Sequence, residues 1–223
     1  MNKAKGNMYP GISDTHNAVK GKCPHGCSYC YMNKLYKRRL IKPQETYLDM
    51  KMLDANLGKG KFIFIGNSCD MWADSVPDLF IYEALKQANK FPENKYLFQS
   101  KNPIRFLQFS DALPQNCCTG ATIETNRIYP CMGNTPPPED RAMAIDCKPA
   151  GECFIAIEPI LDFDLDDFKA LLSNAAPDYI YIGADSGNNH LPEPAKEKIL
   201  ELIAELEKFT TVVKKKNLGR LTA

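Results

Sequence analysis

Short, continuously apolar runs alternate along the chain with segments whose apolar residues recur every three or four positions. Runs of the first kind are typical of strands buried on both faces of a parallel sheet. They predict strands at residues 61–66, 96–99, 119–124, 153–158, 179–182 and 211–213. Segments of the second kind carry one apolar stripe and are typical of helices packed on such a sheet. They predict helices at residues 31–39, 49–57, 78–90, 103–109, 139–145, 164–172 and 195–208.

The order of these elements predicts an α/β fold. A strand followed by a helix, about six times over, is the pattern of a parallel barrel or a doubly wound sheet. We predict a partial (β/α)6 TIM-type barrel with parallel strands, in one domain that spans residues 1–223 and begins with an irregular lead-in at 1–14. An extended piece at 15–19 precedes the first helix. In a barrel of this kind, chemistry belongs at the carboxyl ends of the strands.

Composition and charge narrow the class of protein. Hydrophobic residues make up 44% of the chain and charged residues 25%, as in an ordinary soluble protein. The formal net charge is +1, so overall charge predicts neither nucleic-acid nor membrane binding. No run approaches the roughly 18 apolar residues of a membrane span. Nine cysteines, an odd number with no signal-peptide pattern, disfavour a disulfide framework and predict a reduced, cytoplasmic protein.

Three of the nine cysteines are closely spaced. Cys23, Cys27 and Cys30 are separated by three and by two residues, so their sulfurs can converge on one small group. A [4Fe–4S] cluster takes thiolate on its irons, and without a fourth cysteine at motif spacing one iron would stay open to a small molecule. The alternative is structural zinc, with His16 or His25 as the fourth ligand. The histidines of the chain are otherwise expected in turns or at the surface.

Polar residues follow the predicted strands, at the edge where a barrel would hold its site. Each of them is weak evidence alone, because strand ends are often polar turns. Together they would surround one mouth of the barrel with hydrogen-bond donors and acceptors. In chain order they are Asn67, Ser68, Cys69 and Asp70, then Ser100 and Lys101, then Glu124, and then Glu158.

The cysteine spacing, with Tyr29 just before the last cysteine, resembles the signature of the radical S-adenosylmethionine (SAM) superfamily. The polar strand ends extend the resemblance over most of the chain, and they look like those of the spore photoproduct lyases and a related set of small phage-associated radical SAM proteins. The resemblance implies that Cys23, Cys27 and Cys30 ligate a [4Fe–4S] cluster whose open iron binds SAM.

The resemblance also implies which residues bind this second cofactor. The backbone of Tyr29 would lie near the adenine, and Asn67 or Ser68 would contact the amino group. Lys101 would contact the carboxylate of SAM, and Glu124 its ribose. The full set of cofactor-binding residues is then Tyr29, Asn67, Ser68, Ser100, Lys101, Glu124 and Glu158.

The activity implied by the resemblance is hydrogen abstraction. A reduced cluster donates one electron to the sulfonium of SAM, and the resulting 5′-deoxyadenosyl radical abstracts hydrogen from a substrate. The partner would be a one-electron reductant of the flavodoxin or ferredoxin type. Cys69 is the candidate hydrogen donor to a product radical, and the alternative for it is a small buried apolar side chain. A phage-encoded protein of this kind would act in the host cytoplasm.

A nucleic-acid base or nucleotide is the leading substrate class. It is motivated by the resemblance and by five basic residues that follow the cysteines, Lys34, Lys37, Arg38, Arg39 and Lys42. The alternative for this stretch is a solvated helix face. The lysines at 214–216 would either form a solvated end or close the mouth with positive charge. Two other functions stay open, a glycyl-radical activating enzyme that acts on a partner protein and a non-catalytic module that binds zinc or a cluster.

Overall fold

An eight-stranded sheet forms the centre of the protein, as seen in a computed structural model that describes residues 1–4 and 6–223. Its strands, in spatial order, are β1 (Asn2–Lys3), β2 (Asp14–His16), β5 (Phe62–Ile65), β6 (Lys95–Ser100), β7 (Cys117–Thr122), β8 (Glu152–Ile157), β9 (Tyr179–Ile182) and β10 (Thr211–Lys214). β1 pairs antiparallel with β2, and every later pair in the sheet is parallel. A separate antiparallel pair joins β3 (Val19–Lys20) to β4 (Tyr47–Leu48).

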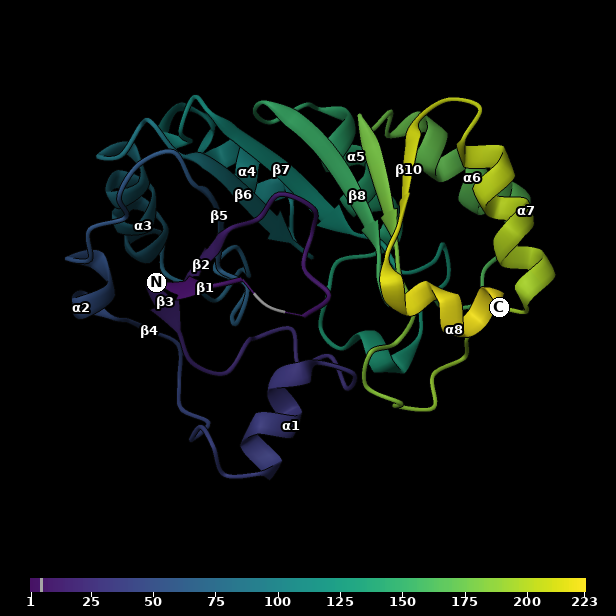
Figure 1. The fold of residues 1–223 in the computed structure, drawn as a ribbon, viewed down its shortest axis with the longest axis horizontal. Helices are drawn as coiled ribbons and strands as arrows, with labels where there is room; N and C mark the ends of the chain where they lie inside the picture. The colour runs from purple at the N-terminus through teal and green to yellow at the C-terminus, as the bar shows by residue number, and fades with distance from the viewer. Residues whose placement is uncertain (5) are drawn as a thin grey trace.

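α-Helices surround this curved sheet, most of them on its outer side. They are α1 (Tyr31–Lys37), α2 (Met50–Leu53), α3 (Asp78–Asn89), α4 (Ile104–Gln108), α5 (Pro138–Asp146), α6 (Leu165–Asn174), α7 (Lys196–Leu206) and α8 (Gly219–Thr222). In Figure 1, α3 to α7 surround the sheet from outside, whereas α1 lies on the other side, near the ends toward which the strand arrows point. Strand–helix units from β2 to α7, followed by β10, confirm the predicted α/β fold with parallel strands.

Both faces of the sheet are buried, which explains the continuous apolar runs in the sequence. All six residues of β7 are buried. On the outer side, Phe98 belongs to one apolar cluster with Trp72 and Phe106. Ile180 belongs to a second cluster with Phe168 of α6. A third cluster lies on the inner face of the sheet. Apolar burial on two faces stabilises the strands without any need for alternation with polar residues.

The N-terminal lead-in supplies part of this inner cluster. The ring of Tyr9 lies 4.5 Å from that of Tyr181 and 5.5 Å from that of Phe154, measured between centroids. The prediction of an irregular lead-in at 1–14 is therefore wrong in part, because the segment contains β1 and fills the concave side of the sheet. A polar two-residue strand has no apolar alternation by which the sequence could reveal it.

Two of the predicted helices are shorter than expected. The first ends at Lys37 because Arg39 adopts a left-handed backbone with φ of 54°, and the second spans only Met50–Leu53. In the second, the backbone N–H of Ala55 donates to Met52 three residues back, so the last turn tightens and the helix stops. Over the described residues, no helix has the length and apolar character needed to cross a membrane.

Candidate active site

A cavity of about 560 Å³ opens at the carboxyl ends of the strands. Its walls come from the cysteine loop at residues 22–30, from α1, from the residues that follow β5, β6, β8 and β9, and from residues 7–9 of the lead-in. The volume lies in the range of sites for small molecules and cofactors. The strand ends predicted to hold the chemistry therefore do face one cavity.

The structure brings almost all of the predicted site residues to this cavity. The residues that line it are Cys23, Cys27, Tyr29, Cys30, Asn67, Ser68, Cys69, Ser100, Lys101 and Glu158. Glu124 is the exception, because it is fully buried behind the wall and reaches the site through Tyr29 and Lys101. Their proximity is a structural fact, whereas the cofactor contacts assigned to each of them stay predictions.

Local backbone geometry presents the three cysteines to the cavity. Gly26 adopts a φ of 66°, which glycine reaches without strain, and its N–H donates to the carbonyl of Cys23. The N–H of Cys30 donates to the carbonyl of Cys27, and Cys30 directly precedes α1. Two successive turns thus bring thiols from one short loop to the same cavity, which fits the donor set of a cluster bound by three cysteines.

The thiols of this loop differ in their electrostatic surroundings. A hydrogen bond from the Cys69 thiol is the main reason why the pKa of Cys23 falls to about 6. Burial raises the pKa of Cys27 and that of Cys30. Across residues 1–4 and 6–223, no three His, Cys, Asp or Glu side chains are arranged to hold a single metal ion.

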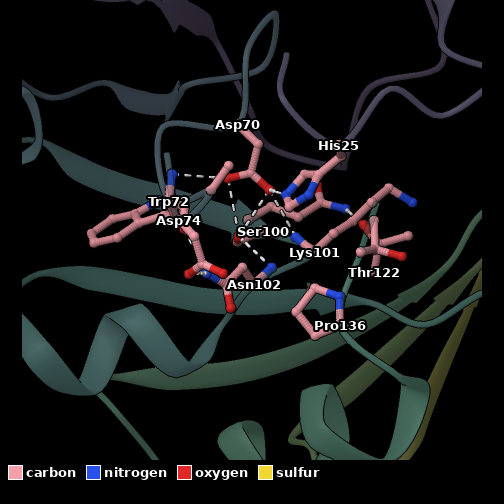
Figure 2. Close-up of polar contacts among 12 residues, drawn as sticks. His25, Asp70, Trp72, Asp74, Ser100, Lys101, Asn102, Thr122 and Pro136 are labelled. Atoms are coloured by element: carbon pink, nitrogen blue, oxygen red, sulfur yellow. Dashed lines mark hydrogen bonds and ion pairs between the residues drawn. The ribbon is translucent and has the colours of Figure 1, made fainter. Parts of the chain in front are cut away.

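Asp70 connects the cysteine loop to the sheet (Figure 2). Its carboxylate accepts hydrogen bonds from the hydroxyl of Ser100, at 2.9 and 3.0 Å, and from the backbone N–H groups of Lys101 and Trp72. The Nε2 atom of His25 lies 2.8 Å from Oδ2 of the same carboxylate. Asp70 is therefore held by donors from three segments of the chain.

His25 and Asp70 shift each other's protonation in opposite directions. Burial lowers the pKa of His25, but the hydrogen bond and negative charge of Asp70 outweigh it, so that the pKa of His25 is raised. Burial raises the pKa of Asp70, yet His25 and the N–H of Lys101 bring it below its usual value. The expectation that histidines lie in turns or at the surface is wrong for His16, which is part of β2 and 1% exposed, whereas His25 does lie in a turn, although it is only 3% exposed.

A second buried charge network lies behind the cavity wall. Glu124 pairs with Arg141, whose Nη1 atom is 2.8 Å from Oε2, and neither side chain is exposed. The other oxygen of Glu124 contacts Lys101 and the hydroxyl of Tyr29. Burial raises the pKa of Glu124, but the two cations outweigh it and lower this pKa to about 2. Sequence reasoning missed Arg141, since a single arginine in a helix carries no distinguishing pattern.

We expect the Glu124 network to make the free energy of unfolding depend on pH in the acid range. The folded pKa of about 2 lies below the ordinary 4.5, so the stabilisation is complete above pH 4.5 and is lost as pH falls toward 2. Urea unfolding of the wild type and of Glu124→Gln should therefore converge as pH is lowered through this window. Glu201→Gln, at an exposed position, serves as the control. Parallel pH profiles of the wild type and Glu124→Gln would contradict the assignment.

One wall of the cavity lies far along the sheet from the cysteines. There, side chains of the lead-in and of the end of β10 meet at Glu158. Glu158 accepts from the side-chain amides of Asn7 and Asn217 and pairs with Lys215 at 2.6 Å. The ammonium of Lys215 also lies 4.3 Å from the ring centre of Tyr9. Of the lysines at 214–216, Lys215 is thus the one that brings positive charge to the mouth.

Sequence comparison assigns the chain to a family. The sequence model of the family described as "Protein of unknown function (DUF5131)" matches residues 12–203, which is most of the chain. The chain belongs to the DUF5131 family. No sequence among curated proteins matches this DUF5131 protein.

The fold of the DUF5131 protein is similar to that of several solved structures. It superimposes on a spore photoproduct lyase double mutant with bound AdoMet and dinucleoside spore photoproduct, with a TM-score of 0.64, 11% identity, and coverage of 93% of this chain and 78% of the other. Methylornithine synthase (PylB) gives a TM-score of 0.54 at 12% identity, with coverage of 90% and 64%. The DUF5131 protein therefore has the partial barrel fold of radical SAM enzymes, as its motifs predict.

Proposed function

We propose that this DUF5131 protein is a radical SAM enzyme that binds a [4Fe–4S] cluster through Cys23, Cys27 and Cys30. The observation that carries the proposal is that these three thiols line the same cavity as the polar ends of β5 and β6, at the mouth of a barrel with the radical SAM fold. When bound, such a cluster supplies the electron that cleaves SAM to methionine and the hydrogen-abstracting 5′-deoxyadenosyl radical.

The protein's own residues would bind and orient SAM in this cavity. Lys101 places a cation at the wall, since its side chain is 15% exposed and its ammonium contacts Glu124 and the Tyr29 hydroxyl. This position suits the carboxylate of SAM. The side chain of Asn67 is itself fixed, because its Oδ1 atom accepts from Asn17 at 2.8 Å. Groups held in this way orient a ligand without first having to be ordered.

Anaerobic reconstitution tests the proposal directly. The purified protein is loaded with iron and sulfide and then incubated with SAM and dithionite, and 5′-deoxyadenosine is measured by chromatography. We expect a brown protein with about four irons per chain that forms 5′-deoxyadenosine. A colourless protein that carries zinc and does not react with SAM would overturn the proposal in favour of a non-catalytic module.

Cys69 is proposed as the donor of a hydrogen atom to a product radical. It lines the cavity, is 2% exposed, and has a pKa raised by its contact with Cys23 and by burial, so that its S–H bond stays intact. Cys69→Ala should leave the yield of 5′-deoxyadenosine within about twofold and change the product formed from substrate. Cys147→Ala, which removes an exposed thiol, is the control. An unchanged product would reject this assignment.

A nucleic-acid base or nucleotide is proposed as the substrate class. In support, a spore photoproduct lyase of similar fold carries a dinucleoside spore photoproduct. Four cations that follow the cysteine loop are exposed, and none of them forms an ion pair within the described residues, namely Lys37, Arg38, Arg39 and Lys42. Lys37 is in α1, the helix whose Lys34 lines the cavity, and the other three follow the end of this helix. Free cations beside a cavity favour a ligand with phosphates.

Replacement of these four cations by Ala should weaken the binding of a single-stranded oligonucleotide. The slope of log K against log salt concentration is negative, and its magnitude should decrease by about three, since each phosphate contact on a single strand contributes about 0.7. Fluorescence anisotropy at several salt concentrations measures it. The control replaces four exposed lysines elsewhere, Lys59, Lys86, Lys90 and Lys208. Equal slopes for the two variants, or binding that does not depend on salt, would contradict the proposed substrate class.

A further inference from the structure

The cysteine loop has no helix or strand of its own to fix it. Residues 22–30 form turns between β3 and α1, and α1 projects away from the barrel (Figure 1). A cluster ligated by three cysteines needs their thiols at defined positions, so something else has to hold the backbone of this loop. Contacts on two sides of the loop do so in this structure.

We propose that His25 is the positioning residue that fixes the cysteine loop for cluster binding, an inference that rests on the proposed function. The imidazole is buried, with 4% of the side chain exposed. Its Nε2 atom lies 2.8 Å from the Asp70 carboxylate, and its Nδ1 atom lies 3.1 Å from the carbonyl oxygen of Asn134. Both neighbours are acceptors only, so each ring nitrogen donates one hydrogen bond. His25 borders the cavity, but both of its ring nitrogens are engaged by Asp70 and Asn134, so it acts through the cysteines on either side and not as a ligand.

The first anchor of His25 is rigid. Asp70 follows β5, and its carboxylate accepts from Ser100 at the end of β6 and from the N–H of Lys101 next to it (Figure 2). A carboxylate with several donors from the sheet has little freedom to move. Through the bond to His25, the ends of two neighbouring strands therefore set the position of the cysteine loop.

The second anchor is the segment between β7 and α5. The N–H of Ser28 donates to the carbonyl of Cys131 at 2.9 Å, and the N–H of Asn134 donates to the carbonyl of His25 at 2.7 Å. Gly133 lies against the same loop with a φ of 72°, and a Cβ atom there would be 2.1 Å from the carbonyl oxygen of His25. Only glycine fits this approach.

These two anchors form a loop clamp, made of His25, Asp70, Cys131, Gly133 and Asn134. The cysteine loop lies between the strand ends on one side and the segment 131–134 on the other. Residues that orient metal ligands from behind change metal affinity by about 10- to 100-fold when they are replaced. The loop clamp should therefore control how long a cluster stays bound, and with it the effect of SAM on the cluster.

The test compares His25→Ala with two variants that each keep one of the two donors. Gln places an amide N–H near the position of Nε2, toward Asp70, and Asn places one near Nδ1, toward Asn134. Each reconstituted protein is exposed to a chelator, and the loss of cluster absorbance is followed in time. His190→Ala, at an exposed histidine, is the matched control.

We expect cluster loss to be about tenfold faster in His25→Ala than in the wild type. Cluster loss should be slower in His25→Gln than in His25→Asn, because a hydrogen bond to a carboxylate is stronger than one to a carbonyl. The paramagnetic resonance spectrum of the reduced cluster should also respond less to SAM in His25→Ala. If the side chain of His25 only filled space, the rates of cluster loss in His25→Gln and His25→Asn would not differ.

The variant Gly133→Ala tests the second anchor, the segment 131–134. Its methyl group would displace the carbonyl of His25, so we expect cluster loss at least as fast as in His25→Ala, with the cofactor-free protein still folded by circular dichroism. If His25→Ala, His25→Gln and Gly133→Ala all lose the cluster at the rate of the wild type and His190→Ala, the positioning role is wrong while the proposed function stands. If the wild type binds no iron, the proposed function itself fails.

Discussion

Replacement of Cys27 by Ala will reduce the formation of 5′-deoxyadenosine from SAM to the level of a protein-free control. The three thiols of the cysteine loop are the complete set of motif ligands, so removal of one leaves two irons of the proposed cluster without a protein ligand. Cys27 is also the most enclosed of the three, with 6% of its surface exposed and its sulfur 3.1 Å from the carbonyl of Met132. Water or buffer thiols therefore have little access to take its place.

The measurement combines iron content, absorbance and 5′-deoxyadenosine yield after anaerobic reconstitution. Cys147→Ala is the matched control, since it removes one of the nine cysteines at an exposed position outside the cavity. It should retain iron and activity. A Cys27→Ala protein that keeps four irons and cleaves SAM as the control does would exclude the cysteine loop as the cluster site.

Replacement of Arg141 by Met will lower the free energy of unfolding by about 3–5 kcal/mol, which is the usual cost of removing one partner from a buried ion pair. Neither Arg141 nor Glu124 is exposed, so the carboxylate cannot turn to water for compensation. The guanidinium also donates to the carbonyl of Thr122 at 2.9 Å and to that of Pro136 at 2.7 Å, and both acceptors would be left without this donor.

Thermal unfolding of the cofactor-free protein measures this effect, and for a chain of this length we expect the midpoint to fall by about 10 °C. The control Arg38→Met removes an exposed arginine and should change stability by less than about 0.5 kcal/mol. In the double variant Glu124→Gln with Arg141→Met, the loss should be smaller than the sum of the single losses, because the two residues are in contact. Additive losses would show that the pair is not coupled.

The parallel sheet could be predicted because its strands from β5 to β10 are apolar runs that can be recognised from neighbouring residues alone. Phe62–Ile65 and Glu152–Ile157 are short apolar runs followed by polar residues, and the helices between them have a single apolar stripe. A parallel sheet with helices on its outer side follows from that alternation alone. The lead-in could not be predicted in the same way, because the inward position of Tyr9 depends on partners that lie far along the chain, Phe154 and Tyr181.

The same distinction applies to the candidate site. Cys23, Cys27 and Cys30 form a motif within eight residues, and Ser100 with Lys101 directly follows a strand, so local sequence is enough to propose them. The contacts of His25 are different, since Asp70 lies 45 positions away and Asn134 lies 109 positions away. No periodicity or spacing connects residues at such separations. Only the register of the strands brings them together.

The inner position of Tyr9 and Asn7 has a consequence for the order in which the protein folds. During synthesis these residues emerge well before their partners, and Asn7 is separated by 151 positions from Glu158. Contacts of such long sequence separation form slowly and late, so the inner face of the early strands stays uncovered while the ribosome completes the chain. The cavity wall that faces the cysteines is thus finished only after the last strand has been made.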